Sequence, residues 1–156
     1  MSVETDLQAT PVGSLDLSEY TTVAATATIR QTLTALRTER HNCAFIMDGD
    51  TLVGIFTDRD ILTKLADGQH AAYLDQPITT LMTSNPITVD VTASTHTAMQ
   101  LMEANHFRNV PVLADGRVIG NFTHFSIIRY LADHVPQATY NLPPNPNLAA
   151  NGPYGG

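Results

Sequence analysis

The sequence contains very little of several residue types that mark particular classes of protein. It has one cysteine and no tryptophan among 156 residues, and aromatic residues make up 6% of the chain. A single cysteine cannot form a disulfide within the chain, so a small disulfide-stabilised scaffold is excluded. No apolar run approaches the roughly 20 residues that a membrane-spanning helix requires. We therefore expect no membrane partner.

Basic residues are also scarce. Together, lysine and arginine number 8 against 15 aspartates and glutamates, which gives a formal net charge of −7. This charge disfavours nonspecific binding to nucleic acids or to anionic membranes. Residues 1–10 are polar and acidic and lack the basic and apolar regions of a signal peptide. We therefore expect a cytoplasmic protein with no nucleic-acid partner.

Motifs for catalysis and metal binding are missing as well. The chain has no Gly-x-Ser-x-Gly elbow, Walker loop or dinucleotide-binding fingerprint. Its 6 histidines show no paired His-x-x-x-His spacing, and no cysteine or acidic cluster completes a metal site. Cys43 begins an apolar run, which favours a buried and unreactive thiol. The sequence thus predicts neither an enzyme nor a metal-binding protein.

An internal repeat organises the chain. Residues 11–67 align with residues 77–133 without a gap, and the most similar stretches are Val53–Leu62 and Ile119–Ile128. Identical residues at matched positions include Thr22 and Thr88, Gly54 and Gly120, Phe56 and Phe122, Thr57 and Thr123, and Ile61 and Ile127. A fixed period indicates two copies of one supersecondary unit, and each copy alone is too short to bury much core. We expect the two copies to pack on each other.

Each copy shows the same order of elements: an extended run, a helix, a hairpin and a second helix. Thr26 and Thr92 are expected to cap the first helices, and Thr57 and Thr123 the second helices. The helix after Thr26 is predicted to end near Arg40. An Asp-Gly pair between two apolar runs predicts each hairpin. The expected strands are residues 21–25, 43–47 and 51–56 in the first copy and residues 87–91, 110–113 and 117–122 in the second.

The predicted domain division follows the repeat. The N-terminus, residues 1–10, and a Pro/Asn/Gly-rich C-terminal tail, residues 136–156, are both expected to be flexible. Between them lie the first repeat at residues 11–68, a linker at residues 69–76 and the second repeat at residues 77–135.

A β-α-β-β-α unit with Gly-h-h-Thr-x-x-Asp at its last strand-to-helix junction resembles the CBS domain, a family named after cystathionine β-synthase. Gly54–Leu62 is close to the commonest form of this motif, Leu81–Val89 is similar to the usual repeat opening, and Asn109–Val112 to the second strand. The resemblance covers residues 11–135. It implies an α+β fold (an α/β-type CBS fold) in which two β-α-β-β-α repeats pack through their sheets with pseudo-twofold symmetry, known as a Bateman module. The end of the chain, from His134 to Pro144, is similar to stand-alone bacterial members.

In this family the cleft between paired repeats binds adenine nucleotides or other adenosyl compounds, so the resemblance implies a ligand-sensing module. Thr57 would stand at a helix N-terminus, where unpaired N–H groups favour an anion. The Asp60 carboxylate would accept two hydrogen bonds from a ribose diol. Arg59 and, from the facing repeat, Arg108 would supply cations for phosphate. We expect AMP, ADP or ATP as the ligand, although S-adenosylmethionine, NADH or a dinucleotide messenger stays open, and no cofactor is required.

The resemblance also implies a place for the base of the ligand. Asn42, Cys43 and Ala44, at the start of the second strand, match the family's base-contacting positions, and Thr21 lies nearby on the first strand. Small side chains at these positions leave room for a planar ring. We therefore include these residues in the candidate site.

The second copy departs from the motif. Thr123 matches Thr57, but Ser126 replaces Asp60. A neutral hydroxyl is a weaker acceptor than a carboxylate and cannot hold a diol with two oxygens. We therefore expect one strong site, near Asp60, rather than two equal ones.

Alternative interpretations stay open for both the residues and the function. Thr-x-x-Asp is nearly a capping box, in which case Thr57 and Asp60 would only satisfy the start of a helix. Arg59 and Arg108 are equally explained as solvated surface charges. The alternative function is a structural dimerisation module without ligand sensing, and the family implies a homodimer in both cases. Because no catalytic or DNA-binding domain is fused, any regulated partner would be a separate protein.

Overall fold

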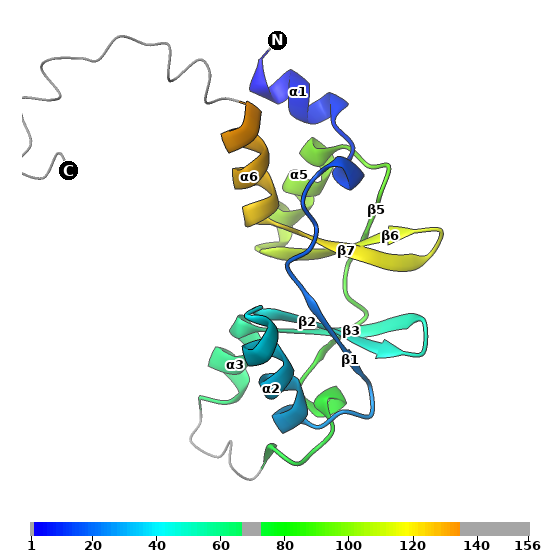
Figure 1. The fold of residues 1–156 in the computed structure, drawn as a ribbon, viewed down its shortest axis with the longest axis vertical. Coiled ribbons are helices and arrows are strands. Elements are labelled where there is room, and N and C mark those ends of the chain that lie inside the picture. Colours follow the sequence, from blue (N-terminus) through cyan, green and yellow to red (C-terminus); the bar gives the residue numbers. More distant parts are fainter. Residues whose placement is uncertain (1, 67–72, 135–156) are drawn as a thin grey trace, which may run out of the picture.

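Two small sheets, one from each sequence copy, form the centre of the molecule (Figure 1). Our computed structural model describes residues 2–66 and 73–134. The first sheet has the order β1-β2-β3-β4 and the second has the order β5-β6-β7. In each sheet the first strand pairs in parallel with the second, and the second and third strands form an antiparallel hairpin. The strands are β1 (Thr21–Ala24), β2 (Cys43–Asp48), β3 (Thr51–Thr57), β4 (Thr83–Ser84), β5 (Val89–Asp90), β6 (Asn109–Ala114) and β7 (Arg117–Thr123).

Helices flank the sheets at matching places in the two copies, and the predicted α+β class with two β-α-β-β-α repeats is confirmed. The first helix of each unit links its first two strands, and the second helix follows its hairpin. The helices are α1 (Val3–Ala9), α2 (Ile29–Glu39), α3 (Asp58–Lys64), α5 (Thr95–Asn105) and α6 (His124–His134), with short 3-10 turns η1 (Val12–Ser14) and η2 (Ile78–Thr80).

The central strand of the first sheet is buried on both of its faces. β2 lies between β1 and β3, and its residues Cys43, Ala44, Phe45 and Ile46 have no exposed surface. Because successive side chains of a strand point to opposite faces, one set packs against the helices and the other faces the second sheet. Contacts between β3 and β7 join the sheets. The copies therefore pack through their sheets, as predicted.

Two predicted helix caps are wrong. The first helices start after Thr28 and Ser94 rather than after Thr26 and Thr92. The hydroxyl of Thr28 accepts from the Gln31 N–H at 3.1 Å, and the Gln31 side chain accepts from the Thr28 N–H at 2.9 Å. This reciprocal pair stabilises a start at Thr28, because it satisfies two unpaired donors at once. The predicted helix end is confirmed, since Arg40 is the C-cap in a left-handed conformation.

The N-terminus, expected to be flexible, contains a helix instead. Ser2 caps α1, and Leu7 is buried with 6% of its surface exposed. The carbonyl of Thr10 accepts hydrogen bonds from both the backbone N–H and the hydroxyl of Thr95, at 2.8 and 2.9 Å. Val3 and Leu7 are spaced four apart, which is the helical pattern that this stretch carries. α1 thus packs on α5 of the second copy.

The opening segment of each copy packs against the other copy. Val12 and Leu15 lie in the core of the second unit with Phe122, and Ile78 lies in the core of the first unit. Backbone hydrogen bonds also join each opening segment to the other copy: the Ile78 N–H, for example, donates to Ala27 O at 2.8 Å. Figure 1 shows the chain running from α1 beside the second unit down to β1 in the first. The two units therefore cannot separate without opening both cores.

Some predicted segments lie outside the described residues. The tail at 136–156 and the first half of the linker, residues 69–72, are not among the residues that the structure describes. The described end of the linker packs on α2, because Leu74 O accepts from the Arg30 N–H at 2.9 Å.

Candidate functional site

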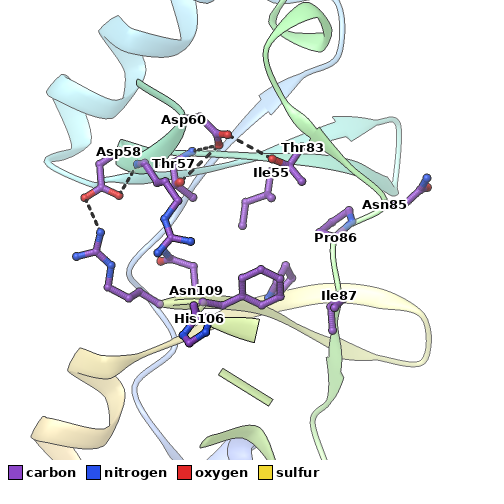
Figure 2. Close-up of a pocket in the computed structure, with 14 residues that line it drawn as sticks. Ile55, Thr57, Asp58, Asp60, Thr83, Asn85, Pro86, Ile87, His106 and Asn109 are labelled. Atoms are coloured by element: carbon purple, nitrogen blue, oxygen red, sulfur yellow. Dashed lines mark hydrogen bonds and ion pairs between the residues drawn. The ribbon is translucent and has the colours of Figure 1, made fainter. Parts of the chain in front are cut away.

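A cavity of about 360 Å³ lies between the two units (Figure 2). The first unit contributes the end of β3 and the start of α3. The second contributes the segment before β5 and the start of β6. A volume of this size falls within the range of small-molecule sites. Of the predicted site residues, this cavity brings together Thr57, Arg59, Asp60 and Arg108.

The strand-to-helix junction of the first copy positions the acidic group. Thr57 ends β3 and is the N-cap of α3, which places Asp60 in the first turn. The Asp60 carboxylate accepts from the Thr57 N–H at 2.9 Å, so it satisfies the helix start in the way the capping interpretation predicts. Asp60 also lines the cavity, with 7% of its surface exposed. Capping and ligand contact are therefore compatible here.

Other donors surround the remaining side of the Asp60 carboxylate. Lys64 Nζ lies 3.0 Å from Oδ1 and also donates to Leu81 O at 2.7 Å. The Thr83 hydroxyl donates to the same Oδ1 at 3.3 Å, and the Thr57 hydroxyl lies 3.4 Å from Oδ2. A carboxylate has about four acceptor positions. A ribose diol would therefore replace one of these donors, and exposed Thr83 is the easiest to displace.

Cationic side chains reach the cavity from both units. Arg108 Nη2 lies 3.7 Å from Asp58 Oδ2, and the side chains are 54% and 39% exposed. Such an exposed pair contributes little, so the guanidinium can turn toward an anion. Arg59, next to Asp58, has no ion pair with any described residue. His106 adds an imidazole ring on the second-unit side (Figure 2).

The walls of the cavity are mostly apolar, and the sequence prediction missed this part. The apolar wall combines Ile55 of the first unit with residues of the second copy. The apolar lining residues are Ile55, Pro86, Ile87, Phe107 and Pro111. The repeat could have predicted these residues, because Ile87 and Arg108 of the second copy match Thr21 and Asn42 of the first. The base-contacting positions of the family should have been assigned to the second copy, which faces Asp60, and not to the first.

The remaining predicted residues of the first copy lie elsewhere. Asn42 lines a second cavity, also of about 360 Å³, which is the pseudo-equivalent of the first. The side chains of Cys43 and Ala44 are fully buried, and Thr21 is 1% exposed and donates to Glu39. These four residues therefore do not line the cavity around Asp60.

The second cavity lacks a free acidic group at the position that matches Asp60. The Ser126 hydroxyl donates to Asp16 O at 2.6 Å and accepts from the Thr123 N–H at 3.1 Å. Ser126 is 1% exposed and Thr123 is 3% exposed. Both hydroxyl groups thus serve the helix start and the docking of the N-terminal segment.

Ion pairs occupy the rim of this second cavity. Arg129 donates to Asp16 at 2.8 Å and to Glu19 at 2.7 Å. The hydrogen bond to Glu19, followed by the charges of both acids, raises the pKa of Arg129 above its usual value. Hydrogen bonds from Ser18, with a smaller contribution from Arg129, lower the pKa of Asp16. Glu19 and Arg129, which both line the second cavity, therefore already neutralise each other.

Cys43 is buried, as the sequence predicted. Burial raises the pKa of its thiol far above the usual value, and the nearby charges of Asp58 and Asp60 add to this shift. Because the thiolate is the reactive form, we expect folded protein at pH 8 to resist alkylation by iodoacetamide for hours. Protein unfolded in guanidinium should react within minutes, with mass spectrometry as the measurement. Rapid stoichiometric labelling of the folded protein would contradict this burial.

Two further features bear on function. No helix among the described residues is both long and apolar enough to cross a membrane. Within residues 2–66 and 73–134, no group of three His, Cys, Asp or Glu side chains is placed to hold a metal ion.

Several known proteins are similar to this chain in sequence and in architecture. The CBS-domain family model matches residues 12–67 and 78–133. A CBS domain-containing protein of Arabidopsis thaliana, CBSCBSPB1, is 34% identical over 109 residues, which are 69% of this chain and 20% of that protein. The solved structure of CBSX2 in complex with AMP is 25% identical, with a TM-score of 0.67 over 80% of this chain and 98% of that one.

A second solved structure is similar to the same degree. The CBS domain pair of MJ0100, in complex with 5′-methylthioadenosine and S-adenosyl-L-methionine, is 28% identical, with a TM-score of 0.69 over 80% of this chain and 98% of that one. The chain spans between 20% and 60% of the length of the curated relatives that it matches. Because the family model covers both sequence copies, the chain belongs to the CBS-domain family and contains two CBS domains in tandem.

Proposed function

We propose that this protein is a regulatory module that binds an adenosyl compound in the cleft around Asp60 and signals to a separate partner protein. One observation carries the proposal: a single cavity combines a carboxylate, two arginines and apolar walls contributed by both repeats. The similar CBS domain pairs in complex with AMP and with S-adenosyl-L-methionine support this ligand class.

The groups that line the cavity are chemically complementary to the base, the ribose and the phosphate of an adenosine nucleotide. The apolar wall, with Phe107 and Ile87, suits a planar base. The Asp60 carboxylate suits a ribose diol, since hydrogen bonds to a charged acceptor are strong. Arg59 and Arg108 suit phosphate, and a guanidinium binds phosphate oxygens in pairs. The arginines favour AMP, ADP or ATP over an adenosyl compound without phosphate.

A ligand in this position would contact both units at once. It would stabilise the arrangement in which Asp60 and Arg108 face the same space, and a ligand shifts a population only when it binds one arrangement better than another. A partner that recognises the ligand-stabilised arrangement would then sense the ligand. We expect the regulated module to be a cytoplasmic homodimer.

Calorimetric titration of the purified protein with AMP, ADP, ATP and S-adenosylmethionine tests the proposal. We expect one tight site per chain, with a phosphate-bearing nucleotide as the strongest ligand. Two equal sites per chain would contradict the assignment of Asp60 as the distinguishing residue. Absence of binding throughout the panel would overturn the proposed function.

A specific observation favours the alternative, a structural dimerisation module. Leu62 on α3 and Ile128 on α6 occupy matching positions in the two copies, and they are 69% and 55% exposed. Exposed apolar side chains that repeat in this way suit an interface between subunits. A stable dimer in light scattering, together with no ligand in the titration, would favour this function.

We expect Thr83→Val to bind AMP more tightly than the wild type. The substitution removes the hydroxyl that occupies Asp60 Oδ1 and keeps the shape of the side chain. Because one competing hydrogen bond is lost, the dissociation constant should fall by about two- to tenfold. Ser84→Ala, on the same short strand but outside the cavity, serves as the control in the same titration. Weaker binding by Thr83→Val would instead show that its hydroxyl contacts the ligand.

A further inference from the structure

Two asparagines connect the cavity to the interior of the second sheet. Asn109, the first residue of β6, lines the cavity between Phe107 and Pro111. Asn121 lies on the adjacent strand β7 and is fully buried. Its side-chain Nδ2 donates to Asn109 Oδ1 at 3.0 Å and to the backbone carbonyl of Glu19 at 2.9 Å. The two side chains thus form a short chain of hydrogen bonds that ends at the cavity.

The backbone carbonyl of Glu19 determines the orientation of both amides. A carbonyl oxygen can only accept, so Asn121 must direct its Nδ2 toward Glu19. The second hydrogen on this nitrogen then points to Asn109, whose Oδ1 must accept the hydrogen bond. The Nδ2 of Asn109 is left with two N–H donors. Asn109, which lines the second-unit side of the cleft (Figure 2), therefore has both N–H groups of Nδ2 available as donors, while its Oδ1 already accepts from Asn121.

The fold itself does not require these amides. At the matching positions of the first copy stand Cys43 and Ile55, which build an equivalent hairpin without them. Burying an amide costs free energy unless its groups are hydrogen-bonded. The Oδ1 of Asn121 has no hydrogen-bond partner within the described residues. A buried amide kept at this cost points to a role for the orientation that it imposes on Asn109.

We propose that Asn109 determines base specificity by donating a hydrogen bond from Nδ2 to an acceptor atom of the ligand's base, and that Asn121 is the positioning residue that fixes this donor. The proposal rests on the proposed function, because it takes the base to lie against the apolar wall next to Asn109. Among adenosyl compounds and related ligands, the site would then select a purine base that turns a ring nitrogen with a free lone pair toward β6.

The test compares AMP with its 1-deaza, 3-deaza and 7-deaza analogues, each of which replaces one ring nitrogen by CH. In wild-type protein, one analogue should bind about fivefold or more weakly than AMP, as expected for a lost hydrogen bond. Asn109→Asp retains the acceptor for Asn121 and replaces the donor nitrogen with an oxygen. In this variant the preference for AMP over that analogue should disappear or reverse.

Asn85→Asp is the matched control, because it adds the same charge at the rim of the same cavity. It should weaken AMP and the analogue equally and leave their ratio unchanged. Asn121→Leu should reduce the preference for AMP, with thermal unfolding used to confirm that the variant is folded. If AMP binds but all three analogues bind equally well, or if Asn109→Asp keeps the wild-type ratio, the inference is overturned while the proposed function stands. If no adenosyl ligand binds, both fail together.

Discussion

Replacing Asp60 with alanine should raise the dissociation constant for AMP by about a hundredfold or more. The ribose diol would lose two hydrogen bonds to a charged acceptor, each worth about 1.5 to 3 kcal/mol, and 1.4 kcal/mol corresponds to a factor of ten. The change also leaves the Thr57 N–H and the Lys64 ammonium without the carboxylate that now pairs with them. The measurement is calorimetric titration of both proteins at the same pH and salt concentration.

Two variants separate ligand contact from helix capping at this position. Asp60→Asn keeps an oxygen for the Thr57 N–H but removes the charge, so it should preserve most of the stability and still lose much of the affinity. Ser126→Ala changes the matching position of the second copy and should leave AMP binding unchanged. A dissociation constant for Asp60→Ala within twofold of the wild-type value would reduce Asp60 to a helix cap.

Replacing Gly120 with alanine should destabilise the fold by about 2 to 3 kcal/mol, because the strand has no room for a side chain at this point. An added Cβ would overlap the Cβ of Leu17 and lie 3.1 Å from Leu17 O. That carbonyl accepts the Asn121 N–H at 2.9 Å and holds the N-terminal segment across β7. For a chain of this size, the midpoint of thermal unfolding should fall by roughly 4 to 12 °C.

Gly54 provides the matched control, because it occupies the same position in the first copy. Its added Cβ would meet mainly the thioether end of Met82, a flexible side chain that can move aside. Gly54→Ala should therefore cost less than Gly120→Ala in the same calorimetric scan. Equal losses, or no loss for Gly120→Ala, would show that the N-terminal segment is not held against β7 in solution.

The prediction of local structure depended on how many residues could play the same role. The predicted cap at Thr57 is confirmed. For the first helix the sequence predicted Thr26, whereas the structure has Thr28 as the cap, because the Gln31 side chain accepts a hydrogen bond from the Thr28 N–H. The N-terminal helix was not predicted, because it packs on α5, which is far away in the sequence.

By itself, the sequence determined the repeat, the order of elements within each copy, the two packed sheets and the acidic residue at the start of α3. These features depend on residues that are close together in the sequence and on the 66-residue repeat, which can be seen in the sequence itself. Only the tertiary structure decided which segments meet. Besides the predicted Arg108, the cleft around Asp60 contains Phe107 and Asn109 of the facing unit, whereas Asn42 belongs to the second cavity. The physical reason is that the opening segment of each copy buries its apolar residues in the core of the other, and such long-range burial leaves no local pattern.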